Sequence, residues 1–209
     1  MNTNKLNIKT MKFNYLYIMK TTRFFMSALF CLALFTSCSN DDDNPEPVNP
    51  EELITNVILT FTNNTDASDT VVLASVAPDG QDGSSTETIT GNFTSGEIYA
   101  LSLEITNASE TPAEDVLNDD IIPEADEHFF AYAVNGINLT MTRDANDIDG
   151  PNGSKLGVHT TWVAGNASAG NVQFILTHEP TSTDDSNGFG NVTGGSQDLN
   201  ITFTSVEIE

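Results

Sequence analysis

Two of the three histidines in this chain stand next to carboxylates. His128 directly follows Glu127, and His178 directly precedes Glu179. Imidazole nitrogen combined with carboxylate oxygen suits zinc or another divalent transition metal. Neighbouring residues of a strand point to opposite faces, so each pair supplies one ligand unless it lies at a strand end. We therefore predict a metal site in which His128 and His178 share an acidic partner, provided that their segments lie side by side.

The alternative interpretation of these histidines is structural. His178 ends an alternating apolar stripe of Val172, Phe174 and Leu176, which is typical of a histidine held by hydrogen bonds at the rim of a core. The third histidine, His159, has no acidic neighbour in the sequence, and we predict that it is structural.

A second candidate site is the acidic loop DANDIDGPNG at residues 144–153. Asp144, Asp147 and Asp149 offer the oxygen ligands that calcium prefers. Counting back from Gly150 as the sixth position places an alanine first, where an EF-hand loop needs a carboxylate. Calcium binding and a solvated acidic turn are therefore both open interpretations of this loop.

Signatures of the common enzyme classes are absent from the sequence. It contains no G-x-S-x-G, H-E-x-x-H or G-x-x-x-x-G-K-[ST] pattern. Carboxylates are numerous enough for a glycosidase pair, but Trp162 is the only tryptophan and sugar-stacking side chains are few. We predict that the protein is not an enzyme and has a binding or accessory role.

One cysteine, Cys38, stands between an apolar run and three aspartates in the stretch LFTSCSNDDD. Basic residues precede about a dozen mostly apolar ones at 24–35, as in a secretory signal, and this run is shorter than the ~20 residues that span a bilayer. The stretch resembles a bacterial lipobox, in which the cysteine is acylated after cleavage. We predict a signal peptide over residues 1–37, with Met19 as the natural start. An ordinary signal peptide with an incidental cysteine is the alternative.

Charge is divided unevenly about the predicted cleavage point. All 30 acidic residues follow it, whereas only Arg143 and Lys155 of the seven basic residues do, which gives the mature chain a formal charge of −28. Such a surface repels nucleic acid. It also repels anionic lipid head groups, so membrane attachment must depend on acyl chains. Residues 38–51 are acidic and contain proline, and we predict a lipidated, extended tether.

The rest of the chain alternates apolar and polar residues in short blocks rich in Thr, Val, Ile and aromatics. The blocks are 53–61, 70–76, 99–106, 129–134, 137–142, 156–163, 172–177 and 199–208. Short strands separated by turn residues favour an all-β fold, and we predict one antiparallel, immunoglobulin-like β-sandwich over residues 52–209.

Two local features qualify this pattern. Asn135-Gly136 is typical of a type I′ turn, and it predicts a hairpin between the blocks on either side of it. The segment 112–126 has helical character but is interrupted by Pro123, so we predict only a short helical turn there.

Several short stretches together resemble a known family. They are ITNV at 54–57, TPAED at 111–115, EADEHFF at 124–130 and LTHEP at 176–180. In this order they are similar to a group of flavobacterial lipoproteins catalogued as the type 1 periplasmic binding fold superfamily, whose function is undefined. The resemblance implies a lipid-anchored protein of the outer membrane in the Bacteroidota. The fold that we predict comes from the strand pattern and not from that group's name.

Two further expectations follow from this resemblance. The aspartates after Cys38 resemble the export signal of surface lipoproteins in the Bacteroidota, which implies a surface-exposed protein; a plain periplasm-facing linker is the alternative. Asp69-Thr70-Val71 resembles an O-glycosylation sequon of the same group, with an unmodified surface turn as the alternative. As an alternative function we consider divalent metal capture, with zinc or calcium as the ion, for an uptake system that includes a TonB-dependent receptor.

Overall fold

The computed structural model describes residues 52–81 and 83–209. The predicted signal peptide, the acylated Cys38 and the tether at 38–51 lie outside the described residues. Pro50–Glu209 form one compact unit. Within the part of the chain that the structure describes, no helix is long and apolar enough to cross a membrane.

The described chain is built from strands, as the alternating pattern predicts. The strands are β1 (Asn56–Asn63), β2 (Thr70–Val76), β3 (Thr86–Thr90), β4 (Ile98–Thr106), β5 (His128–Asn135), β6 (Leu139–Arg143), β7 (Thr160–Ala164), β8 (Ser168–His178), β9 (Ser182–Asp184), β10 (Asn191–Thr193) and β11 (Ser196–Ile208). Each predicted block overlaps one of them. The sequence pattern misses β3, β9 and β10, which are short and expose most of their side chains.

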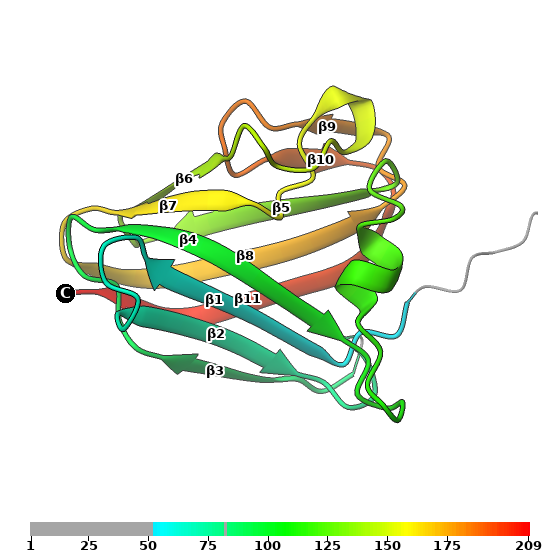
Figure 1. Cartoon of the computed structure of the whole chain (residues 1–209), viewed down its shortest axis with the longest axis horizontal. Helices are drawn as coiled ribbons and strands as arrows, with labels where there is room; N and C mark the ends of the chain where they lie inside the picture. The colour runs from blue at the N-terminus through cyan, green and yellow to red at the C-terminus, as the bar shows by residue number, and fades with distance from the viewer. Residues whose placement is uncertain (1–51, 82) are drawn as a thin grey trace, which may run out of the picture. The chain divides into compact units, whose positions relative to one another are not determined.

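Two antiparallel sheets pack face to face, which confirms the predicted β-sandwich (Figure 1). The larger sheet has the order β3-β2-β1-β4-β7-β6, the smaller has the order β11-β8-β5, and β9 and β10 form a separate ribbon. Trp162 lies in the core between the sheets. Its indole makes edge contacts with Phe61 of one sheet at 5.3 Å and with Tyr132 of the other at 5.5 Å.

The predicted Asn135-Gly136 hairpin is wrong. β5 pairs with β8 in the smaller sheet, whereas β6 pairs with β7 in the larger sheet. A type I′ turn needs positive φ at both central residues, and here Gly136 has a φ of 82° while Asn135 does not lie in that region. β5 buries its first five side chains on both faces, so it belongs inside the sandwich and the chain crosses between sheets at Gly136.

The predicted short helical turn is present. A single π-type turn covers Leu117–Ile121, and a 3₁₀ turn covers Pro151–Gly153 elsewhere. Val116, Leu117 and Ile121 are buried in the core, so the first turn is fixed against the sandwich just before β5 begins. The turn therefore positions the residues at 124–127 above the ends of β5 and β8.

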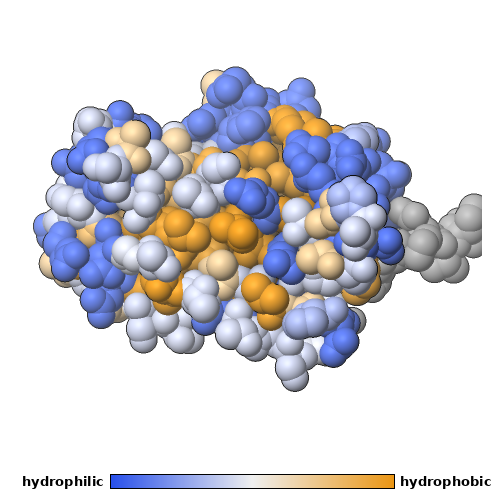
Figure 2. All heavy atoms as spheres, turned by 60° about the horizontal axis from the view of Figure 1, so that its bottom comes forward, coloured by the Kyte–Doolittle hydropathy of each residue, from blue (hydrophilic) through white to orange (hydrophobic). Residues whose placement is uncertain are grey.

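The outer face of the larger sheet carries little charge. Its strands direct Thr, Val, Ile and Ala side chains outward, and Glu104 is the only charged residue at an outward position of β1, β2, β3, β4 or β7. Figure 2 shows apolar side chains gathered across the middle of one side of the molecule, with hydrophilic ones toward the ends. Thr70, the predicted glycosylation site, is the half-buried first residue of β2, and its modification stays a prediction.

The crossing at Gly136 gives a test of this topology. A Cβ on Gly170 would collide with the backbone of Asn135, Gly136 and Ile137. We expect Gly170→Ala to lower the free energy of unfolding by about 1–3 kcal/mol through overpacking. The neighbouring Asn171 is exposed, so Asn171→Ala should change it by less than about 0.5 kcal/mol. Urea denaturation measures both, and equal stability of the two variants would contradict the crossing.

Candidate metal centre

The register between β5 and β8 places His128 directly opposite His178. The two imidazole rings stack with their centroids 4.7 Å apart and an interplanar angle of 10°. Both side chains are buried at the ends of their strands. The two segments therefore lie side by side, as the predicted metal site requires. Each histidine of the stacked pair also has carboxylates nearby.

The outer group consists of Glu124, Glu127 and His178. One ligand atom from each lies within 4.8 Å of the others. His178 Nε2 is 3.4 Å from Glu127 Oε2, and the Glu127 side chain is 48% exposed. Ligand atoms of a tetrahedral zinc site with bonds of about 2.0–2.1 Å lie roughly 3.3 Å apart, so this pair needs almost no rearrangement to hold an ion.

The inner group consists of Glu52, His128 and Asp198. Its ligand atoms also lie within 4.8 Å of one another. His128 is 0% exposed, and its Nε2 is 4.0 Å from Glu52 Oε2. The other ring nitrogen, Nδ1, is 3.1 Å from the backbone carbonyl oxygen of Glu124, which fixes the ring orientation as a metal-bound histidine requires.

Three elements bring these ligands together. The turn at 124–127 is closed by a hydrogen bond from Glu127 N to Glu124 O. Asp198 lies where the β11–β8 register shifts between Gln197 and Leu199, and such a bulge redirects a side chain. Glu52 precedes β1.

Sequence reasoning found His128, His178 and Glu127 but missed Glu52, Glu124 and Asp198. Glu124 lies four residues before His128. A turn predicted between these two residues would have indicated that their side chains lie close together. Glu52 and Asp198 carry no comparable signal, because tertiary packing alone brings them to His128.

Glu179 does not join either group. Its side chain is exposed and its backbone has a φ of 48°, which turns the chain away after β8. Its backbone N–H donates a hydrogen bond of 2.6 Å to Glu127 O, so it contributes to the site through the backbone only. The predicted ligand Glu179 is thus replaced by Glu124.

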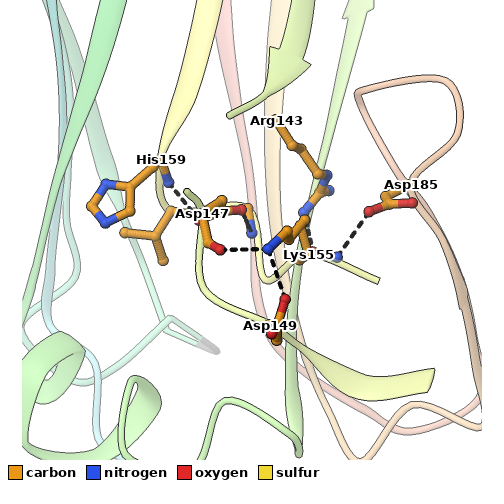
Figure 3. Close-up of polar contacts among 8 residues, drawn as sticks. Arg143, Asp147, Asp149, Lys155, His159 and Asp185 are labelled. Atoms are coloured by element: carbon orange, nitrogen blue, oxygen red, sulfur yellow. Dashed lines mark hydrogen bonds and ion pairs between the residues drawn. The ribbon is translucent and has the colours of Figure 1, made fainter. Parts of the chain in front are cut away.

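The acidic loop is organised around one buried carboxylate (Figure 3). Asp147 accepts hydrogen bonds from three backbone N–H groups, those of Gly157, Val158 and His159, at 2.7–3.1 Å. Both carboxylate oxygens of Asp147 are therefore occupied by the protein itself, and this residue closes the loop.

The three predicted calcium ligands have separate partners. Asp144 accepts a hydrogen bond from Thr161, and Asp149 pairs with Lys155 at 2.7 Å. Among the described residues, these aspartates do not converge on one set of metal ligands. The interpretation as a structural turn accounts for all three contacts.

The only two basic side chains after the predicted cleavage point both bind this region. The Arg143 guanidinium donates to the carbonyl oxygens of Phe130, Lys155, Gly188 and Phe189. Burial lowers its pKa, while nearby Tyr132, Asp147 and Asp185 act in the opposite direction.

Lys155 contributes two contacts to the same region. Its ammonium donates to Asp147 O at 2.8 Å and pairs with the Asp149 carboxylate, as Figure 3 shows. Both basic side chains that follow the predicted cleavage point thus bind loop carbonyl oxygens, and Lys155 also binds a loop carboxylate.

The chain was compared with known proteins in three ways. No family model, no curated protein and no solved structure matches it.

The loop gives a test that separates structure from calcium binding. Asp147→Ala leaves three backbone N–H groups without their acceptor, and we expect the free energy of unfolding to fall by at least about 2–3 kcal/mol. Asp149 is 90% exposed, so Asp149→Ala should cost less than about 1 kcal/mol. Urea denaturation with and without calcium measures both. A calcium-dependent rise in wild-type stability that either variant abolishes would contradict the structural assignment.

Proposed function

We propose that this protein is a lipid-anchored lipoprotein of the bacterial cell envelope whose β-sandwich binds a divalent transition-metal ion at the outer group. The role is non-enzymatic: the domain holds the ion at the outer membrane, facing outward. One observation carries the metal assignment, namely that the β5–β8 register sets His178 Nε2 3.4 Å from Glu127 Oε2 with Glu124 in reach.

The chemistry of the donors supports a transition metal over calcium. A ligand set with an imidazole nitrogen suits zinc, copper, iron or nickel, whereas calcium takes oxygen ligands. The half-exposed Glu127 leaves the ion accessible, so it is available for exchange. Protons compete with the ion for the imidazole, and binding should weaken as the solution becomes acidic.

The envelope location is supported by the sequence. Cys38 follows a basic and apolar leader and precedes an acidic tether, and the short stretches listed above resemble flavobacterial lipoproteins. A mature chain of charge −28 depends on acyl chains to stay at a membrane. A TonB-dependent receptor that imports the captured ion is the partner that fits this role.

Zinc titration of the soluble chain Ser39–Glu209 tests the metal assignment. Loss of a hydrogen-bonding partner outside the ligand set typically costs 10–100-fold in affinity, so loss of a direct ligand should cost at least about tenfold. We expect this weakening for one zinc ion in both His178→Gln and Glu127→Gln by calorimetry. Glu179→Gln, a neighbouring exposed carboxylate, is the matched control and should bind as the wild type does. Unchanged affinity in both ligand variants would refute the outer site.

Metabolic labelling with palmitate tests the anchor. Cells that express the full chain should label the wild type and not Cys38→Ala, because acylation needs the thiol. The second cysteine, Cys31, lies in the predicted signal peptide, so Cys31→Ala is the matched control and should still be labelled. Equal labelling of the wild type and Cys38→Ala would remove the anchor from the proposal.

A further inference from the structure

Among the residues that the structure describes, a buried nitrogen of the inner group has no hydrogen-bond partner. His128 is 0% exposed, and within the described chain no group bonds to its Nε2. The other nitrogen, Nδ1, contacts a backbone carbonyl oxygen of Glu124 at 3.1 Å. A carbonyl only accepts, so Nδ1 must carry the hydrogen, and in the neutral ring Nε2 holds a lone pair that points into the protein.

Carboxylates face this lone pair. Glu52 Oε2 lies 4.0 Å from His128 Nε2 and is itself buried with no hydrogen bond from the described residues. An oxygen of Asp198 lies within 4.8 Å of both atoms. The buried lone pairs of His128 Nε2 and Glu52 Oε2, which lie 4.0 Å apart, are costly in the folded state. A cation placed between them converts the same arrangement into an attractive one.

We propose that the inner group binds a second divalent transition-metal ion, separate from the ion of the outer group. One imidazole nitrogen and two carboxylate oxygens form a ligand set that suits zinc, and a fourth position remains for water. The 4.0 Å gap between His128 Nε2 and Glu52 Oε2 is too long for a hydrogen bond. It would have to close by about 0.7 Å to reach the roughly 3.3 Å edge of a tetrahedral zinc site. The ligands differ from those of the outer group, so either assignment can fail without the other.

The position of Glu52 gives this ion a specific role. Glu52 directly follows the predicted tether, whereas His128 and Asp198 belong to the smaller sheet. Three residues further on, Thr55 N donates a hydrogen bond to Thr106 O at the edge of β4 in the larger sheet. An ion at the inner group would therefore fasten the start of the described chain, at Glu52, across both sheets.

A pocket lies beside two of the three inner ligands. It has a volume of about 150 Å³ and is lined by Glu52, Asp79 and Asp198, among others. These acids attract cations from solution. Two of the three inner ligands, Glu52 and Asp198, thus line this pocket.

Zinc titration of Ser39–Glu209 tests the second site. The wild type should bind two ions. Glu52→Gln and Asp198→Asn should each weaken one of them by at least about tenfold and keep the other, whereas His178→Gln should show the reverse. Glu104→Gln, on the outer face of the larger sheet, is the matched control and should bind both.

Stability gives a readout that a merely structural Glu52 would not produce. Without metal, Glu52→Gln should raise the melting temperature, because its amide can donate to His128 Nε2. With zinc, the order should reverse, since only the wild type gains the inner ion. Zinc should also slow hydrogen exchange over residues 52–61 in the wild type and in His178→Gln, but not in Glu52→Gln.

Three results would overturn the second site. The first is a wild type that binds a single ion which His178→Gln removes; the cation at His128 would then be a proton. The second is Glu52→Gln that still binds two ions with unchanged affinity. The third is a melting-temperature order that zinc does not reverse. The outer site is judged separately. If His178→Gln loses only the outer ion, the assignment of that site stands whichever of these three results is found.

Discussion

The antiparallel register of β5 with β8 is the constraint on which the candidate site depends. It sets His128 opposite His178, and both strands end there, so the rings stack while the following residues leave the sheet. Because side chains alternate along a strand, a slip of one residue would turn each histidine to the other face. The turn before β5 and the bulge in β11 then bring carboxylates to opposite sides of this stack.

Few basic residues are present to pair with the carboxylates of this arrangement. After Cys38 the chain has only Arg143 and Lys155 as basic residues, and both are bonded to the acidic loop and its neighbours. Among the described residues, neither of these basic side chains is in contact with Glu127 or His128. The excess of carboxylates in this part of the chain is the composition that the proposed metal sites would use.

Sequence reasoning succeeded where the signal is local. The alternating blocks predicted the strands and the sandwich, and Pro123 limited the helical segment to a short turn. The hairpin predicted at Asn135-Gly136 was wrong, because turn residues do not determine which sheet the next strand joins. For the candidate site, the histidines and Glu127 were accessible from the pattern. Asp198 was not, since a bulge depends on how two strands 20 residues apart match in length.

By itself, the sequence determined the all-β class, the excess of acidic over basic residues and the residue types that suit a metal. These follow from alternation, from charge and from side-chain chemistry, which are properties of short stretches. Only the tertiary structure decided which carboxylates accompany each histidine and that Asp147 accepts hydrogen bonds from three backbone N–H groups of the loop. The physical reason is that a ligand set is a matter of distances between segments, and packing of the two sheets fixes these distances.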